Sequence, residues 1–204
     1  MINLKCSGVV INIHSVIPFS RVNGSGARLV IFFQGCNQSC PDCFNPETHS
    51  FKEMNLLTAG EIFAGYLVDG IEGITVSGGE PFEQPSGLFE ILKTAKKGYG
   101  LSTVVYTGFT YKYLAGKNDC KDLFEYIDVL IDGRYDRSKQ EESLLARGSS
   151  NQNFYFLNDR YTIEDFLIPG KVEYTFSKDG SIARTGFGEI SRTAGAEGGG
   201  PALN

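Results

Sequence analysis

The sequence predicts an α/β fold built on an open, mostly parallel sheet, and two observations support this class. Apolar runs of strand length alternate with segments of helical periodicity over most of the 204 residues, as in repeated βα units. A composition of 41% hydrophobic and 21% charged residues, with 15 Phe and 10 Tyr, indicates an ordered globular chain. The length fits one domain with a substantial core and is short for a complete eight-stranded barrel.

The predicted strands are short apolar runs bounded by turn residues. They are residues 28–34, 73–77, 101–107, 127–131, 153–157 and 171–176. A turn at Lys178-Asp179-Gly180 predicts that the last strand returns as a hairpin. A short helical stretch ends at residues 122–126. His14 lies in an earlier apolar run, 9–17, and we interpret it as a satisfied core or edge histidine.

Two longer segments have apolar side chains at helical spacing. In residues 58–68, Thr58 is the expected N-cap and Glu61 completes a capping box three residues later. Residues 85–97 form the second predicted helix, and Gly98 ends it. Strand and helix alternation thus extends through the middle of the chain.

Three cysteines follow the first predicted strand at the spacing Cys-x3-Cys-x2-Cys. Cys36, Cys40 and Cys43 supply three thiolates to a 4Fe-4S cluster and leave its fourth iron open for chemistry. A cluster that only carries electrons normally has four cysteine ligands, and a structural zinc site normally has four Cys or His ligands. The alternative is a zinc site that takes His49 as its fourth ligand. An open iron can instead chelate S-adenosylmethionine and supply the electron that cleaves it.

A glycine pair follows the next predicted strand, in Ser77-Gly78-Gly79-Glu80-Pro81. Two adjacent glycines let the backbone approach a ligand closely, although a plain turn has the same pattern. Ligands of α/β sheets bind beyond the carboxyl ends of the strands. We therefore expect this turn and the cysteine loop to share one site.

The cysteine triad and the Gly-Gly-Glu-Pro run together resemble those of radical S-adenosylmethionine enzymes. Within that superfamily the chain most closely resembles the small activases that install a glycyl radical, especially the anaerobic ribonucleoside-triphosphate reductase activating proteins. The resemblance covers about residues 15 to 190. Its further runs are residues 24–28, 32–36, 43–48, 106–110, 128–133 and 147–152.

The resemblance implies a partial (βα)6 radical S-adenosylmethionine barrel with short C-terminal strands. It implies that Cys36, Cys40 and Cys43 ligate the cluster and that the backbone at Gly78 and Gly79 receives the methionine amino group. No further catalytic residue is assigned. The other expected cofactor contacts are Glu80, Thr107, Asp132, Arg134, Phe44 and Asn45.

Three of these positions deserve separate interpretation. Asp132 and Arg134 can hold a zwitterion or ribose hydroxyls through charge-assisted hydrogen bonds, or form a surface ion pair. Many superfamily members have an aromatic residue before the third cysteine, where this chain has Asp42. Phe44 follows Cys43 instead, as in the reductase activases, which leaves the adenine contact open.

The implied function is reductive cleavage of S-adenosylmethionine to a 5′-deoxyadenosyl radical that abstracts hydrogen. The expected substrate is a glycine of a partner such as anaerobic ribonucleotide reductase, and the expected reductant is a flavodoxin or ferredoxin. One alternative is a stand-alone radical enzyme that modifies a small molecule or a ribosomal peptide. A second alternative is an iron-sulfur sensor without catalysis.

Composition limits the partners and the location that we expect for this protein. A net charge of −5 argues against a nucleic-acid partner, and no apolar stretch has the length of a membrane span. We expect a cytoplasmic protein with one domain at residues 1–192 and a flexible glycine-rich tail at 193–204. Cys6 and Cys120 are expected to be unligated thiols. The turn Gly24-Ser25-Gly26 is expected to pack near the cluster.

Overall fold

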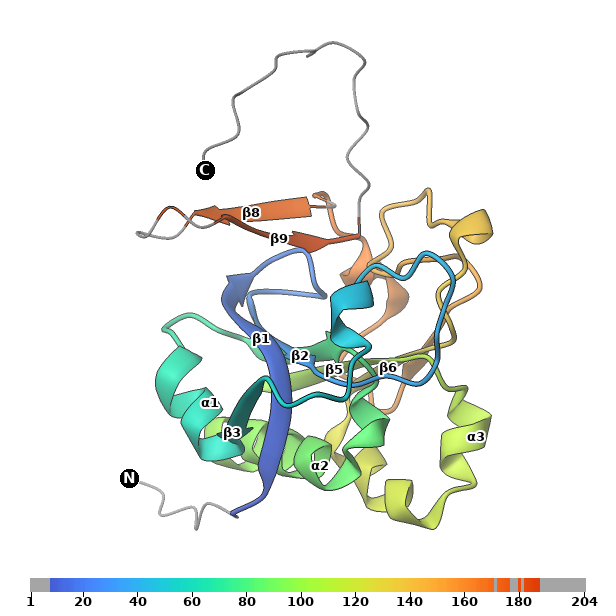
Figure 1. Ribbon diagram of the computed structural model, residues 1–204. Coiled ribbons are helices and arrows are strands. Elements are labelled where there is room, and N and C mark those ends of the chain that lie inside the picture. Colours follow the sequence, from blue (N-terminus) through green and yellow to red (C-terminus); the bar gives the residue numbers. More distant parts are fainter. Residues whose placement is uncertain (1–7, 171, 177–179, 181, 188–204) are drawn as a thin grey trace, which may run out of the picture.

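The structure is a computed structural model in which residues 8–170, 172–176, 180 and 182–187 are described. A seven-stranded sheet forms the centre, and a separate two-stranded hairpin lies above it (Figure 1). The strands are β1 (Val10–Ser20), β2 (Arg28–Phe33), β3 (Asn55–Thr58), β4 (Gly73–Gly78), β5 (Ser102–Thr107), β6 (Val129–Asp132), β7 (Asn153–Phe156), β8 (Val172–Phe176) and β9 (Ile182–Gly186). The α-helices are α1 (Ala59–Tyr66), α2 (Pro85–Lys93) and α3 (Tyr111–Ala115).

The sheet has the order β3-β1-β2-β4-β5-β6-β7. Its centre, β2-β4-β5-β6, is parallel, whereas β1 pairs antiparallel with both β2 and β3, and β7 pairs antiparallel with β6. The predicted α/β class is confirmed, with the parallel block that the βα pattern indicated. The short β3 was not predicted, because it is largely exposed and directly precedes the helix that dominates the local pattern.

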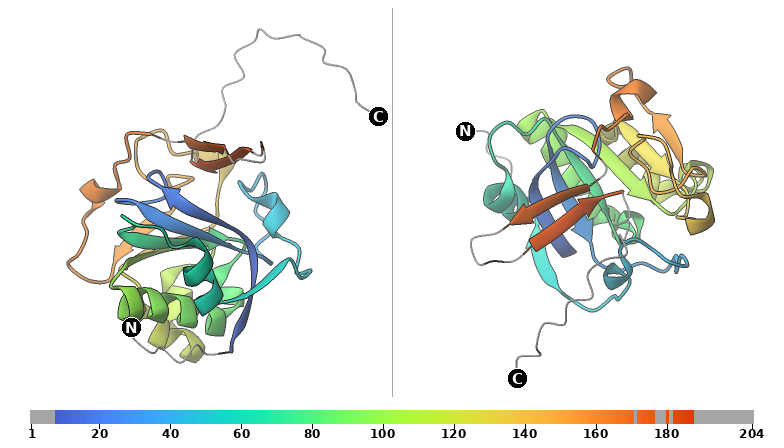
Figure 2. Two further views of the ribbon diagram at one scale, coloured as in Figure 1. Left: turned by 90° about the vertical axis from the view of Figure 1, so that its left-hand side faces the viewer. Right: turned by 90° about the horizontal axis from the view of Figure 1, so that it is seen from above.

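The two faces of the sheet are covered differently. The helices cover one face, seen at the bottom of Figure 1 and of the left view of Figure 2. Side chains such as Ile31 and Val76 pack there against Leu88 and Ile91 of α2. Because side chains alternate along a strand, their neighbours point to the other face. That face packs a smaller group, which contains Val104, Tyr106, Val129, Ile131 and Phe166.

The predicted helix starts are confirmed in detail. The Thr58 hydroxyl accepts the Glu61 N–H, and the Glu61 carboxylate accepts the Thr58 N–H at 2.7 Å, which makes the capping box of α1. Helix α2 begins at Pro85, and a π-helical turn extends it through Gly98. The stretch predicted to end at residues 122–126 is a 3₁₀ segment, Asn118–Tyr126.

The amino ends of the parallel strands are closed by a buried arginine. Arg28 is 0% exposed and donates to Thr75 Oγ1 at 2.7 Å, to Ser102 Oγ at 3.1 Å, and to backbone carbonyls nearby. The turn at Gly24 and Gly26 packs here, against Arg28, Thr75 and Glu72. These contacts lie at the amino end of β2, whereas the cysteines follow its carboxyl end, and the expectation that the turn packs near the cluster stays a prediction.

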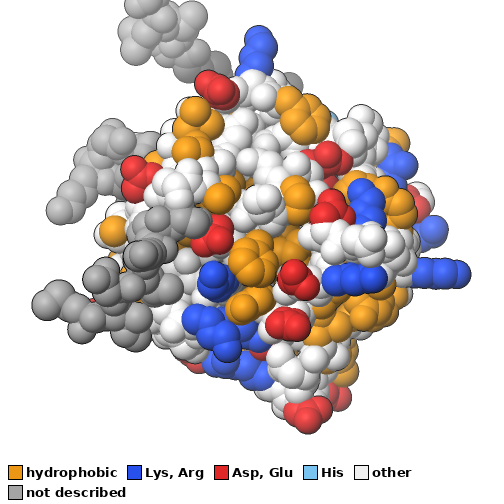
Figure 3. All heavy atoms as spheres, turned by 90° about the horizontal axis from the view of Figure 1, so that it is seen from below, with side chains coloured by type: hydrophobic (Ala, Val, Ile, Leu, Met, Phe, Trp, Pro, Cys, Tyr) orange, Lys and Arg blue, Asp and Glu red, His pale blue; other side chains and the backbone are white. Residues whose placement is uncertain are grey.

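The outer surface and the helices bear on the expected absence of a nucleic-acid partner and of a membrane span. The face opposite the hairpin carries Lys, Arg, Asp and Glu side chains among apolar ones (Figure 3). Within the described residues, no helix combines the length and apolar character that crossing a membrane requires.

Strands β8 and β9 form the predicted antiparallel hairpin. Cys6, the tail at 193–204 and the domain boundary at 192 lie outside the described residues.

Candidate cluster and cofactor site

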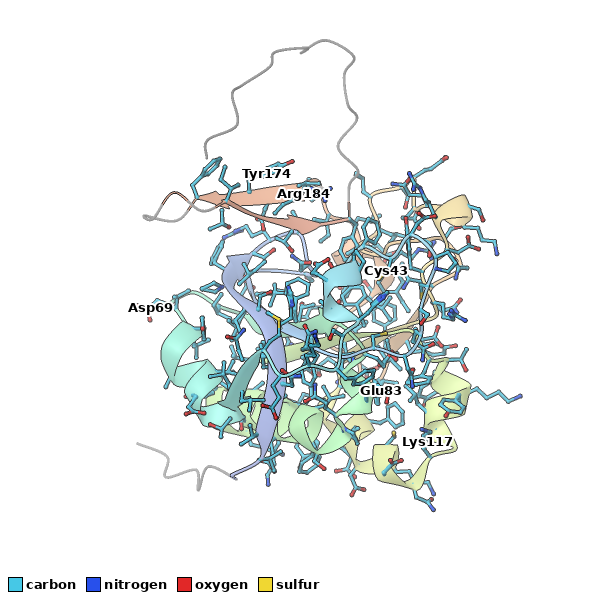
Figure 4. The ribbon with its side chains drawn as sticks, viewed as in Figure 1. Cys43, Asp69, Glu83, Lys117, Tyr174 and Arg184 are labelled. Atoms are coloured by element: carbon cyan, nitrogen blue, oxygen red, sulfur yellow. The ribbon has the colours of Figure 1, made fainter. Side chains whose placement is uncertain are left out.

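A cavity of about 310 Å³ lies at the carboxyl ends of β2, β4 and β5. Cys43 lies in the loop beside this cavity, below the hairpin that carries Tyr174 and Arg184 (Figure 4). Many of the predicted site residues line it, namely Cys36, Cys40, Cys43, Phe44, Asn45, Gly78, Gly79, Glu80 and Thr107. The structure thus brings the cysteine loop and the glycine turn to one site, as the strand order predicted.

The cysteine loop is held at both ends by backbone hydrogen bonds. Gly35 N–H donates to the Thr48 carbonyl at 2.8 Å, and Cys36 N–H donates to the His49 carbonyl at 3.2 Å. All three cysteines in the loop are free thiols and partly buried. The loop therefore places three cysteine side chains at the lining of the cavity.

Two of the sulfurs accept backbone N–H groups within the loop. Gln38 N–H donates to Cys36 Sγ and Asn45 N–H donates to Cys43 Sγ, each at 3.4 Å. Hydrogen bonds of this kind to cluster sulfurs are one way in which proteins set reduction potential. Burial raises the pKa of Cys36 to about 11 and also raises the pKa of Cys43. Metal binding to these thiols must therefore displace their protons.

The arrangement differs from that of a single-ion site. His49 also lines the cavity, which is where the zinc alternative would need it. However, no three His, Cys, Asp or Glu side chains of the described residues are grouped closely enough to hold one metal ion. The ligands of one zinc ion all reach a common centre, whereas each cysteine of a cluster binds its own iron. Three separated cysteine side chains that line one cavity fit a cluster, which they would bind as thiolates.

The glycine pair is required by backbone packing as well as by access to the cavity. A Cβ on Gly79 would lie 2.3 Å from the Gly35 carbonyl oxygen. Gly78 has φ +101°, and a Cβ there would lie 2.5 Å from the Phe33 backbone nitrogen. Gly35 also accepts Glu80 N–H at 2.9 Å. The two glycines therefore let the end of β4 dock directly on the start of the cysteine loop.

Glu80 joins the ends of β4 and β5. Its carboxylate accepts Gly108 N–H at 2.8 Å, the Thr107 hydroxyl at 2.8 Å and Phe82 N–H at 3.1 Å. Burial raises the pKa of Glu80 to about 7, against the opposing effect of these donors. Glu80 and Thr107 line the cavity, but their polar side-chain atoms contact protein partners.

Asp132 and Arg134 brace the site from outside the cavity wall. Asp132 is 1% exposed and accepts Tyr111 N–H at 2.6 Å and the Asn153 amide at 2.9 Å. The Arg134 guanidinium donates to the Gln38 carbonyl, within the cysteine loop. Their expected cofactor contacts stay predictions, while their observed contacts position β7, α3 and the loop.

An aromatic pair forms another part of the wall. The rings of Phe44 and Tyr135 lie 4.4 Å apart between centroids, and both side chains line the cavity. Asp42 has φ +55°, a left-handed conformation that Asp tolerates better than bulky residues do. This backbone geometry gives a physical reason for an aromatic side chain after Cys43 instead of before it.

The remaining candidates lie away from the cavity. His14, within β1, has its Nδ1 2.9 Å from Gln34 Oε1, which confirms a satisfied histidine. Cys120 is 2% exposed and belongs to the helix-side core. Burial raises the pKa of its thiol to about 11.

Several cavity residues were missed in the sequence. Tyr106, Tyr135 and Gln152 lie in or beside runs that carried the resemblance, so position at strand ends could have indicated them. Asn23 and the hairpin residues Arg184, Thr185, Gly186 and Phe187 gave no such signal. Their place at the cavity depends on how distant segments pack.

Comparisons with known proteins agree with this site. A family model described as a 4Fe-4S single cluster domain matches residues 22–155. The anaerobic ribonucleoside-triphosphate reductase-activating protein of Pasteurella multocida (strain Pm70) is 32% identical over 149 residues, which are 68% of this chain and 92% of that protein. Its namesake in Escherichia coli (strain K12) is 32% identical over 162 residues, 72% of this chain and 99% of that protein.

A second kind of relative is the pyruvate formate-lyase-activating enzyme of Clostridium pasteurianum, 39% identical over 126 residues, which are 58% of this chain and 50% of that enzyme. The fold, the cavity and these matches define a radical S-adenosylmethionine enzyme whose cofactors are a 4Fe-4S cluster and S-adenosylmethionine. Within that class, the chain belongs to the family of the anaerobic ribonucleoside-triphosphate reductase-activating proteins.

Proposed function

We propose that this protein cleaves S-adenosylmethionine reductively and installs a glycyl radical on a partner such as anaerobic ribonucleoside-triphosphate reductase. The observation that carries the proposal is the meeting of the cysteine loop and the glycine turn at one cavity. The names of the relatives, which are activating proteins for enzymes of this kind, support the same conclusion.

In this proposal Cys36, Cys40 and Cys43 hold the cluster. When bound, the cluster supplies the electron that cleaves the sulfonium bond of S-adenosylmethionine to give a 5′-deoxyadenosyl radical. The backbone at Gly78 and Gly79 receives the methionine amino group.

The other predicted cofactor contacts have different roles in this proposal. Phe44 and Asn45 border the cofactor. Glu80 and Thr107 hold the strand ends at fixed spacing behind it. Asp132 and Arg134 act as polar groups next to the site, with Arg134 fixing the cysteine loop through the Gln38 carbonyl.

The finer assignments belong to the same proposal. A flavodoxin or ferredoxin is the reductant, because cleavage needs one low-potential electron. The protein works in the cytoplasm, where a reducing environment keeps cysteine thiols free to bind iron.

Cofactor cleavage is the first test. Protein reconstituted anaerobically and reduced with dithionite should convert S-adenosylmethionine into 5′-deoxyadenosine and methionine, and Cys40→Ala should give at least a hundredfold less. Cys120→Ala is the matched control, since this thiol is buried outside the cavity, and it should retain both cluster and cleavage. An intact wild-type cluster with no cleavage would indicate a sensor instead.

Radical transfer is the second test. Electron paramagnetic resonance of the reduced protein mixed with S-adenosylmethionine and the reductase should give a glycyl doublet. Cleavage without a doublet on any glycyl radical enzyme of the source organism would favour a small-molecule or peptide substrate.

A further inference from the structure

The hairpin β8-β9 lies outside the matched residues 22–155 and is anchored across the end of β1. The Glu173 carboxylate accepts the Ser20 hydroxyl at 2.6 Å and Arg21 N–H at 3.0 Å. The Asn23 amide donates to Thr185 Oγ1 at 2.7 Å. These contacts, of which only that of Arg21 is exposed, place the hairpin above the end of the sheet, as both views of Figure 2 show.

One edge of the hairpin borders the cavity. Arg184, Thr185 and Gly186 are consecutive in β9, and all three line the cavity. Neighbouring side chains of a strand point to opposite faces, so three consecutive residues border one space through the strand's edge. Phe187 continues this wall, with its ring 5.5 Å from that of Tyr106.

This edge has main-chain groups to offer. Strand β8 pairs with one edge of β9, and no described strand pairs with the other. An unpaired strand edge presents a row of N–H and C=O groups that bind an extended peptide. In this protein the free edge of β9 and the cysteine loop line the same cavity.

We propose that the free edge of β9 binds the glycine-bearing segment of the partner protein as an added strand. This inference rests on the proposed function. A target glycine has no side chain to recognise, so its α-carbon must be positioned through the backbone on either side of it. A strand edge binds a peptide in that way, and this one runs along the space where the radical is generated.

The outer face of the hairpin is a separate surface and provides the control. Tyr174, Phe176 and Ile182 are 50%, 73% and 62% exposed there. Side chains alternate between the two faces of a strand. Glu173 and Thr185 face the central sheet, so these three side chains lie on the opposite face of the hairpin. A double substitution, Tyr174→Ser with Phe176→Ser, removes apolar surface and leaves the edge of β9 intact.

The main test is hydrogen exchange in the complex. The holoenzyme with S-adenosylmethionine, without reductant, is mixed with a glycyl radical enzyme on which the reduced wild type gives the doublet. Amides of residues 182–187 on the free edge should exchange at least tenfold more slowly in the complex than in the free holoenzyme. A complex that leaves these amides unprotected overturns the proposal.

A pair of proline variants links the edge to binding. Adjacent residues of a strand direct their N–H groups to opposite edges, so one of Arg184→Pro and Thr185→Pro removes a free-edge donor and the other a bond to β8. The variant whose β8 amides stay protected is the edge variant, and Thr185→Val, which removes the hydroxyl that accepts the Asn23 amide and keeps the backbone N–H, is the control for loss of that anchor. It should bind the partner at least tenfold more weakly, measured by sedimentation, while the Tyr174/Phe176 double variant binds as wild type.

Three results would contradict the inference. The double variant could lose the partner while the edge variant keeps it, which would identify the outer face as the docking surface. Protection of residues 182–187 could appear in the free holoenzyme as its concentration rises, which would mean that a second copy pairs there. Tight partner binding by the edge variant would exclude strand addition. Failure of the proposed function differs from all three, because the wild type would then cleave no S-adenosylmethionine or give no doublet.

Discussion

The parallel strands β2 and β4 are closed at one end and open at the other. At the amino end, the buried guanidinium of Arg28 donates to Thr75, Ser102 and nearby carbonyls, and no carboxylate of the described residues forms an ion pair with it. At the carboxyl end, glycines bring backbone together and a cavity remains. At the amino end the polar groups hydrogen-bond to one another. At the carboxyl end cysteine sulfurs and backbone groups line a cavity that can hold a cofactor.

The difference has an energetic basis. Burial lowers the pKa of Arg28, because it removes the guanidinium from water, and five N–H donors need acceptors there. Removing such a group leaves its partners unsatisfied. At the open end the buried carboxyl of Glu80 is the group that is unfavourable to ionise, because burial raises its pKa to about 7. Each end can therefore be perturbed by one substitution.

The largest effect is expected at the closed end. Arg28→Ala should lower the free energy of unfolding by roughly 4 kcal/mol, because it leaves a void and several buried acceptors without donors. Urea unfolding measures this. Arg28→Lys should recover only part of the loss, since one ammonium cannot reach the same set of acceptors. A loss below about 1 kcal/mol for Arg28→Ala would show that the closed end does not depend on this network.

The next effect is expected at the glycine turn. Gly79→Ala places a Cβ against the Gly35 carbonyl, so the end of β4 and the cysteine loop must separate. We expect a loss of roughly 3 kcal/mol in urea unfolding, as for overpacked sites, together with reduced iron uptake on reconstitution. Wild-type stability and iron content in this variant would mean that the close packing at Gly35 is not needed.

Glu80 gives an effect that depends on pH. Its pKa of about 7 lies above the ordinary value of 4.5, so the folded protein keeps a proton that the unfolded chain releases. The resulting stability is complete below pH 4.5 and is lost as pH rises through 7, by roughly 3 kcal/mol. Glu80→Gln should lose this pH dependence. It should also be destabilised by roughly 2 kcal/mol at pH 7.5, because its NH₂ opposes a backbone N–H.

Urea unfolding of both proteins at pH 5 and pH 7.5 tests this. The stability difference between wild type and Glu80→Gln should be larger at pH 5. An equal difference at both pH values would place the pKa of Glu80 outside this window.

The smallest effect is expected away from both ends. Gly65 lies in α1, and a Cβ there meets nothing within 4 Å. Gly65→Ala should raise stability by about 0.5–1 kcal/mol through helix propensity, with unchanged cluster content. Thermal unfolding measures the gain. A loss here would mean that the cost predicted for Gly79→Ala is not specific to the crowded turn.

Sequence patterns predicted the parts of this molecule that are local. The capping box at Thr58, the strand before the cysteines and the glycine turn each depend on a few neighbouring residues. Their meeting at one cavity followed from the rule that parallel strands end on the same edge. The iron-sulfur assignment depended on the cysteine spacing together with the Gly-Gly-Glu-Pro run.

Other features required knowledge of distant partners. Arg28 is buried because Thr75 and Ser102 of neighbouring strands receive it. Asp132 has the position expected of a cofactor ligand, but Tyr111 and Asn153 occupy its oxygens. The place of the hairpin over the cavity follows from contacts such as that between Ser20 and Glu173, 153 residues apart.

The loop between Gly35 and Thr48 is closed by hydrogen bonds within the protein, including the one that the Thr48 hydroxyl donates to the Asn45 carbonyl at 2.7 Å. These bonds join the segment after Cys43 to the residues just before Cys36. A substitution at Thr48 is therefore expected to shift all three sulfurs together.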